Sequence, residues 1–470
     1  MKTNIVIEDA KLFVQIAALV LIASPLCAQT FQTKSEQTAK TDSVSRANVL
    51  DSLVHWRSTD SIPNSRYISF NEFLATVAAD NLDYAVQKYN ISIAQAQVIV
   101  AQLYPDPSLS VGFTTDVTPV PADQKFGNVW SVGASETILL GGKIGDRQDV
   151  AEKNMTAAQA QTEDFFRNLR ATAAQAYIAA LVADSDYKEN ERSYVNLAGL
   201  AHINEERVSA GDLGKTDLIQ SRVDAIQARG AVLQADATRR QAFIQLSHLM
   251  SRRSVDTVYR PMGSLTILLV SPHIFILDSL IARAKATRPD VIAARRAVES
   301  ARFGVDLAHA ERWPDLTVGA GYTYSGASNN TVSPFPGEQA ADVSLSIPLP
   351  ISDLVNHGSI DVAQFTYEQA QKSLEVAELS AENDVRQGYS QYLLSKEQFE
   401  QFSGDMIADA EKVRAARLYS YKAGSASLLD VLTAENTLAS VYLAYYGTLS
   451  GYANALVTLE QAAGMWDVEF

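Results

Sequence analysis

Two short segments of the chain have the residue types and spacing of a charged site or a helix cap. Each contains an Ala-Gly pair, at 210–211 and at 423–424, and each carries an aspartate a few residues later, Asp217 and Asp430. Ser427 and Asp430 have the spacing of a capping box, in which a hydroxyl and a carboxylate close the first turn of a helix. An aspartate in a first turn also interacts favourably with the helix dipole. The chemistry available here is hydrogen bonding and electrostatics.

The rest of the sequence has no catalytic or metal-binding pattern. The six histidines lack the close pairing that metal ligands need. The sequence contains no nucleophile elbow, Walker loop or dinucleotide-binding turn, and the Gly-Gly-Lys at 141–143 lacks the upstream glycine of a phosphate loop. We therefore predict that the protein is not an enzyme and uses no cofactor and no metal site.

Charge and cysteine content exclude further classes. The 470 residues carry 39 Lys and Arg against 54 Asp and Glu, a formal charge of −15. This balance excludes nucleic acid as a partner, because phosphate binding needs concentrated Lys and Arg. The single cysteine, Cys27, ends an apolar run, so a chain cleaved after that run has no disulfide or thiolate site.

The apolar run at 12–26 predicts export. It follows Lys2 and Lys11, is too short to span a bilayer as a helix, and is followed by the small residue Ala28. We assign 1–28 as a signal peptide, with acylation of Cys27 as the alternative. Residues 29–66 are rich in Ser, Thr, Asp and Gln and predict a flexible leader.

Proline placement predicts long helices. The 14 prolines leave 122–260 and 351–470 without one, and proline costs about 3 kcal/mol inside a helix. Both proline-free stretches are rich in Ala, Gln, Glu and Leu, so we expect helices that pack along one another. Further helices are expected at about 71–103 and about 275–312.

Four segments alternate between apolar and polar residues, as strands do when one face is buried or meets lipid. They lie at 108–118, 129–139, 316–325 and 342–349. Four strands cannot close on themselves, and lipid does not tolerate an unpaired sheet edge. Several chains would have to contribute, and three chains would give 12 strands. A soluble β-subdomain is the alternative.

The two halves of the chain resemble each other. Tyr-Pro-Asp at 104–106 aligns with Trp-Pro-Asp at 313–315, and the Ala-Gly pairs and the aspartates after them align as well. Each half has the order helix, strand, strand, long helix, break and helix. The predicted organisation is a first repeat at 67–250, a linker at 251–274, a second repeat at 275–464 and a tail at 465–470.

These features together resemble TolC-type outer membrane efflux proteins, the outer membrane factor family, over about 67–464. The motifs that carry the resemblance are the Tyr-Pro and Trp-Pro junctions, AGDLGKTDL at 210–218 and AGSASLLDVLTAENTL at 423–438. It implies a mainly α fold with transmembrane β-strands, in which the repeats of a homotrimer form a 12-stranded β-barrel continued by a long periplasmic α-helical barrel. The implied protein is a passive exit duct of the Gram-negative outer membrane. It would serve tripartite efflux or type I secretion, docking on a periplasmic adaptor and an inner-membrane transporter.

The resemblance also implies a periplasmic gate. Tyr421 matches the gating tyrosine, Asp217 the aspartate of the first repeat, and Asp430 a pore aspartate. Ala426 stands where the family has an arginine, and Lys215 is the candidate substitute. Three plainer interpretations stay open: Asp430 as a capping residue, Asp217 as a first-turn acid, and Tyr421 as a packed aromatic.

Two further sets of residues have paired interpretations. Gly211 and Gly424 either contact the adaptor at the tip or simply end helices with positive φ. The aromatic residues near the strands either form a girdle in outer membrane lipid or belong to a core; they are Trp130, Trp313, Tyr322 and Tyr324. The alternative function for the whole chain is a soluble periplasmic coiled-coil adaptor or a filament-like structural protein. The transported substrate is not predictable from these residues.

Overall fold

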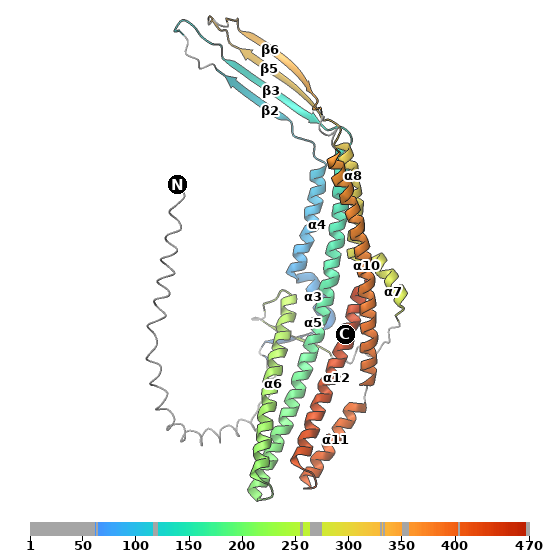
Figure 1. The fold of residues 1–470 in the computed structure, drawn as a ribbon. Coiled ribbons are helices and arrows are strands. Elements are labelled where there is room, and N and C mark those ends of the chain that lie inside the picture. The colour runs from blue at the N-terminus through green and yellow to red at the C-terminus, as the bar shows by residue number, and fades with distance from the viewer. Residues whose placement is uncertain are drawn as a thin grey trace, which may run out of the picture. The chain divides into compact units, whose positions relative to one another are not determined.

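The computed structural model describes most of the chain from residue 62 onward (Figure 1). The described residues are 62, 64–115, 121–253, 257–263, 275–329, 331, 334–349, 357–402 and 405–466. The predicted signal peptide lies outside them, as does nearly all of the predicted leader. The chain divides into two units, one with residues 191–231 as its described part and one with residues 62–190 and 232–470.

The proline-free stretches form long helices, as predicted. The first contains α5 (Lys143–Ala210), of 68 residues, and α6 (Lys215–Leu249). The second contains α10 (Gly358–Gln401), α11 (Asp405–Lys422) and α12 (Leu428–Ala463). In the part of the chain that is described, no helix is both long enough and apolar enough to cross a membrane.

The helices expected at 71–103 and 275–312 are each broken once, which the sequence analysis missed. The first is α3 (Phe70–Asp80) and α4 (Leu82–Ala101), and the second is α7 (Leu277–Thr287) and α8 (Pro289–Ala310).

The two breaks have the same backbone shape but different causes. Asn81 has φ −64 and ψ 121, and Arg288 has φ −64 and ψ 129. Asn81 caps α4, because its side chain accepts the amide of Tyr84 at 2.8 Å. Arg288 is extended because Pro289 follows it, and a residue before proline is driven out of the helical region.

The four alternating segments form one antiparallel sheet in the order β2-β3-β5-β6 (Figure 1). The strands are β2 (Ser108–Thr114), β3 (Val129–Ile138), β5 (Leu316–Ser325) and β6 (Glu338–Ser346). β2 is shorter than expected, and β6 begins and ends earlier than the expected 342–349. Pairing with the full length of β5 sets this register, from Ser325 opposite Glu338 to Thr317 opposite Ser346. β2 and β6 are the edges of the sheet.

A short parallel pair joins the starts of the two halves. β1 (Ser65–Ile68) pairs with β4 (Val258–Pro261), so part of the predicted leader and part of the predicted linker are strands. Tyr177 of α5 fixes the pair, because its hydroxyl lies 2.9 Å from the Ile68 carbonyl and 2.7 Å from the Met262 carbonyl. Burial raises the pKa of Tyr177 to about 12.

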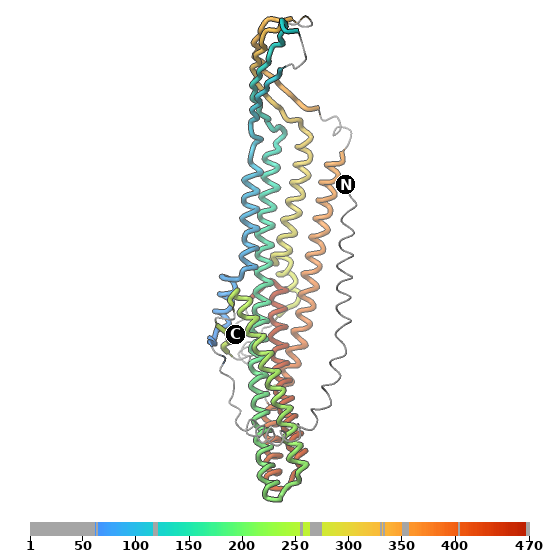
Figure 2. Tube along the Cα trace, turned by 90° about the vertical axis from the view of Figure 1, so that its left-hand side faces the viewer, coloured from blue at the N-terminus to red at the C-terminus, as the bar shows by residue number. Residues whose placement is uncertain are grey.

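The core of the larger unit lies where α3, α7 and this parallel pair cover the long helices. It contains Phe70 and Phe73 against Tyr177, and Leu280 and Ala284 among buried residues of α10 and α12. Between this core and the sheet, α4, the first part of α5, α8 and α10 run side by side (Figures 1 and 2). In chain order, α4 precedes β2, and α10 follows β6.

Candidate functional site

Both Ala-Gly pairs end long helices in the same geometry. Gly211 follows α5 with φ +83, and Gly424 follows α11 with φ +76. In each turn the amide of the residue after the glycine donates to the carbonyl five positions earlier at 2.9 Å, which is the Schellman motif. Positive φ favours glycine because it has no Cβ atom. This geometry accounts for both glycines as helix-ending residues, and a contact with an adaptor stays a proposal.

Asp430 forms the capping box that its spacing predicts. It is the third residue of α12, and its carboxylate accepts from the Ser427 amide at 3.0 Å and from the Ser427 hydroxyl at 2.7 Å. In return, the Asp430 amide donates to the Ser427 hydroxyl at 3.2 Å. The Ser427 hydrogen bonds, with a weaker contribution from Arg417, lower the pKa of Asp430. Asp430 is therefore ionised and held at the start of its helix.

Asp217 occupies the same third position in α6 but lacks this partner. The residue before α6 is Gly214, which has no side chain to accept the first-turn amides or to donate to the carboxylate. Asp217 is half-buried and Lys215 is exposed. Among the residues that the structure describes, neither takes part in an ion pair, so Lys215 does not lock Asp217 within this chain. Of the two equivalent acids, Asp217 is the one left available.

Tyr421 is buried at the end of α11, with 3% of its surface exposed. One helical turn earlier lies Arg417, which acts electrostatically on Asp430. Arg417 and Asp430 also line a groove of about 340 Å³ between α11 and α12. Arg417 was not among the predicted gate residues. Its spacing from Tyr421 was visible, but only the pairing of α11 with α12 brings it near Asp430.

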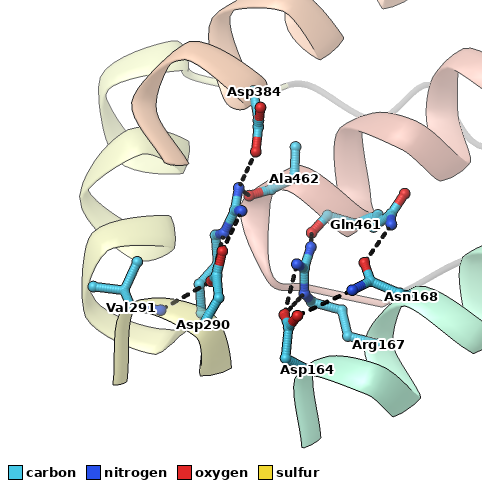
Figure 3. Close-up of polar contacts among 9 residues, drawn as sticks. Asp164, Arg167, Asn168, Asp290, Val291, Asp384, Gln461 and Ala462 are labelled. Carbon is cyan, nitrogen blue, oxygen red and sulfur yellow. Dashed lines mark hydrogen bonds and ion pairs between the residues drawn. The ribbon is translucent and has the colours of Figure 1, made fainter. Parts of the chain in front are cut away.

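A second polar cluster holds the end of α12 (Figure 3). Arg288 donates to Asp290 at 2.6 Å, to Asp384 at 3.0 Å and to the Ala462 carbonyl at 3.2 Å. Burial opposes the charge of Arg288, but the hydrogen bonds that it donates to Asp290 and Asp384, with the charges of these carboxylates, outweigh burial and raise the Arg288 pKa. Burial also disfavours ionised Asp290, yet the bonds from Arg288 lower the Asp290 pKa. Arg167 completes the cluster with a bond to the Gln461 carbonyl at 2.6 Å.

An equivalent hydrogen bond to the end of a long helix occurs in the first half of the chain. Asn81, at the equivalent helix break, donates its side-chain amide to the Leu249 carbonyl at 2.9 Å. Leu249 ends α6, just as Ala462 lies at the end of α12. In each repeat, the residue at the break between the two shorter helices therefore binds the last turn of the repeat's final helix.

One face of the four-stranded sheet is apolar and carries most of the predicted aromatic residues. Phe113, Trp130 and Tyr324 lie directly opposite one another on β2, β3 and β5. Tyr322 lies on the same face, two residues before Tyr324 in β5. Trp313 is exposed beyond the other end of β5. Phe113, whose ring centroid is 4.4 Å from that of Trp130, was missed as a member of this row.

The opposite face of the sheet is polar and consists mainly of Ser, Thr and Gly. The Ser108 and Ser135 hydroxyls are 2.7 Å apart, and the Thr137 and Thr317 hydroxyls are 3.1 Å apart. Asp342 lies on this face in the middle of β6. Within the described ranges, no group of three or more His, Cys, Asp or Glu residues is placed to hold a metal ion.

Residues 280–465 match the family model described as outer membrane efflux protein. This segment is therefore similar to the outer membrane efflux protein family. The match covers the second repeat, from α7 to the end of α12. It confirms the resemblance that the sequence motifs indicated. The family is one of outer membrane efflux proteins rather than enzymes, which agrees with the predicted class of protein and with its predicted outer membrane location.

Relatives extend the likeness to most of the chain. The cobalt-zinc-cadmium resistance protein CzcC of Cupriavidus metallidurans is 24% identical over 391 residues, which are 83% of this chain and 88% of that protein. The outer membrane protein TolC of Vibrio cholerae is 25% identical over 190 residues, 40% of this chain and 43% of TolC.

Solved structures share the fold. CusC matches with a TM-score of 0.69 and 16% identity, covering 88% of this chain and 96% of CusC. The outer-membrane channel OprN matches with a TM-score of 0.66 and 18% identity, covering 86% of this chain and 93% of OprN. The fold is therefore that of outer membrane channels, mostly helical with small sheets.

Proposed function

We propose that three copies of the chain form a channel through the outer membrane, in which twelve strands close a barrel and the helices continue it into the periplasm. The observation that carries this proposal is the four-stranded sheet with an apolar face, whose edge strands β2 and β6 pair with no further strand among the described residues. An edge in lipid leaves its N–H and C=O groups without partners, so the edges need strands from other copies. Four strands from each of three copies give a barrel of ordinary size.

The helices next to the two edge strands also support contact between neighbouring copies. α4 precedes β2 and exposes Leu82, Val86, Tyr89, Ile93 and Val100, which share one side of a helix at heptad spacing. α10 follows β6 and exposes Val362, Phe365, Val376 and Leu379, also at heptad spacing. Such faces are usually covered in an assembly. We infer that β2 and α4 of one copy meet β6 and α10 of the next.

The assembled channel is proposed to be a passive exit duct in a tripartite efflux or type I secretion system. It would dock by its helical turns on a periplasmic adaptor and an inner-membrane transporter, which supplies the energy. The apolar sheet face, with Trp130, Tyr322, Tyr324 and Phe113 towards one end and Trp313 at the other, would contact lipid. Strands of about 10 residues at 3.3 Å each, tilted by about 45°, rise roughly 23 Å, close to the apolar band of such barrels.

The gate is proposed at the helical turns, with Asp217 and Tyr421 as its main residues. Asp430 is already engaged with Ser427, so it would act as a fixed charge at the constriction rather than as a movable lock. In the second repeat, Arg417 is the cation that acts on Asp430. In the first repeat, Lys215, two residues before Asp217, is the candidate cation of the gate. Gly211 and Gly424 would shape the tip that the adaptor contacts.

The cargo to test first is a divalent metal cation. CzcC, which aligns with most of this chain, is named for resistance to cobalt, zinc and cadmium. Deleting the gene in its source organism should lower the tolerated concentration of at least one of these ions. A loss of tolerance to organic dyes alone would redirect the proposal to another cargo.

Site-directed cross-linking tests the assembly. In a Cys27→Ser background, Val343→Cys on β6 is combined in turn with Leu109→Cys, Val111→Cys or Phe113→Cys on β2, because each lies on the apolar face of an edge strand. Oxidation of the membrane fraction should give a covalent trimer for at least one combination and none for the single variants. Recovery of a monomer in the soluble periplasm would instead support the adaptor or filament alternative.

A further inference from the structure

The polar face of the sheet contains one row that differs from its neighbours. Ser110, Gly133, Gly321 and Asp342 lie directly opposite one another across β2, β3, β5 and β6. The two central positions have no side chain, so the side chains of Ser110 and Asp342 extend over the backbone of Gly133 and Gly321. Asp342 is the only charged residue of this row, and it is exposed.

The Asp342 carboxylate lies over the backbone of the neighbouring strand. A Cβ atom placed on Gly321 would be 2.6 Å from Asp342 Oδ1, so the carboxylate occupies the space that a side chain at 321 would need. Among the described residues, Asp342 has no hydrogen bond or ion pair. The four strands contain no Lys or Arg that could neutralise it.

The adjacent rows indicate that covering a glycine does not require a charge. In the next row, Ser344 stands over Gly319, and a Cβ atom there would be 2.5 Å from the Ser344 hydroxyl. In the row on the other side, Ser131 covers Gly112 at the same distance of 2.5 Å. Serine thus covers the glycine in both adjacent rows. What aspartate adds at 342 is a fixed negative charge.

We propose that Asp342 makes the membrane-embedded part of the channel selective for cations. This inference rests on the proposed function, which places the polar face towards water and brings three copies of Asp342 around one passage. The charge stands on the sheet, apart from Asp430 at the start of α12, so the channel would have two separate anionic levels. Glu338, the first residue of β6, lies on the same face and strengthens the negative potential at the strand end.

The range of a fixed charge sets the conditions of the test. Screening confines its field to about 10 Å at 0.1 M salt and about 3 Å at 1 M salt. The wall charge therefore acts on passing ions in dilute salt and is largely screened in concentrated salt. Selectivity that depends on Asp342 must weaken as salt rises, whereas exclusion by the size of the passage would not.

Reversal potentials of single channels in planar bilayers test the proposal. Asp342→Asn keeps the size of the side chain, and Asp342→Ser reproduces the adjacent rows. Each should lower the permeability ratio of K⁺ over Cl⁻ at least about twofold at 0.1 M salt, with a smaller difference at 1 M. Ser344→Asn, on the same face of the same strand, is the matched control and should keep the wild-type ratio.

The possible outcomes distinguish the role of Asp342 from the existence of the proposed channel. Channels of Asp342→Asn and Asp342→Ser with the wild-type ratio would overturn the role of Asp342 and leave the proposed channel intact. If both variants fail to insert while Ser344→Asn inserts, the carboxylate serves assembly, which also overturns a role in selectivity. A wild-type protein that forms no channel would reject the proposed function itself.

Discussion

Removing the guanidinium of Arg288 should destabilise the protein by about 3 kcal/mol. Its side chain is 4% exposed and binds two carboxylates and the last turn of α12. Breaking a buried ion pair from one side costs roughly 3–5 kcal/mol, because the remaining charge loses its partner. The Asp290 and Asp384 side chains are 30% and 46% exposed and can regain water, so we expect the lower end of this range. Arg288→Met removes the charge and keeps much of the apolar stem.

Thermal unfolding of the purified protein in detergent, followed by circular dichroism at fixed concentration, measures the effect. The matched control is Arg295→Met. The Arg295 side chain is 47% exposed and its guanidinium lies 3.7 Å from Glu378, a surface pair of the kind that contributes about 0–1 kcal/mol. Asn81→Leu, at the equivalent break, loses one neutral hydrogen bond to α6 and one helix cap, so a cost of about 1–2 kcal/mol is expected. Equal midpoints for Arg288→Met and Arg295→Met would refute the anchoring role of this cluster.

Three further predictions concern the Arg288 cluster, a helix-ending glycine and the proposed gate. Arg288 holds the Asp290 pKa below its usual value of about 3.9. The stability that this pair contributes is therefore present at neutral pH and is lost as the pH falls below that value. Acid titration should lower the unfolding midpoint of the wild type more than that of Arg288→Met. Gly424→Ala should cost about 1–2 kcal/mol because φ is +76 there, whereas Gly447→Ala, inside α12 with open space around it, should gain up to about 1 kcal/mol. The double variant Asp217→Ala with Tyr421→Phe should raise single-channel conductance by loosening the proposed gate, and an unchanged conductance would remove both residues from it.

The long helices and the strands could be predicted because their signals are local. Proline-free stretches fixed the helices, and alternation located the four strands to within a few residues. The shift of β6 could not be predicted, since Glu338 to Ala341 show no alternation and are held by pairing with β5. The break at Arg288 had a local signal in Pro289. The break at Asn81 had only a weak one, because asparagine caps a helix only where the chain already turns.

The candidate site was predictable only where its partners are close in sequence. The capping box of Ser427 and Asp430 spans three residues and was visible in the sequence. The contact of Arg288 with Ala462 spans 174 residues, and that of Asn81 with Leu249 spans 168. Such pairs depend on how the two repeats fold back on themselves. The position of Asp342 on the sheet was equally unpredictable, because the glycines in its row, Gly321 and Gly133, lie on other strands.

The first turns of α6 and α12 correspond to each other in the two halves of the chain, but they differ in how well they are capped. α12 starts with a reciprocal cap from Ser427, whereas Gly214 leaves the first turn of α6 without one. The opening turn of α6 should therefore fray more readily, with faster amide exchange than its counterpart. In the proposed channel, the first turn of α6 would therefore be the more pliable end of each copy and the first turn of α12 the firmer one.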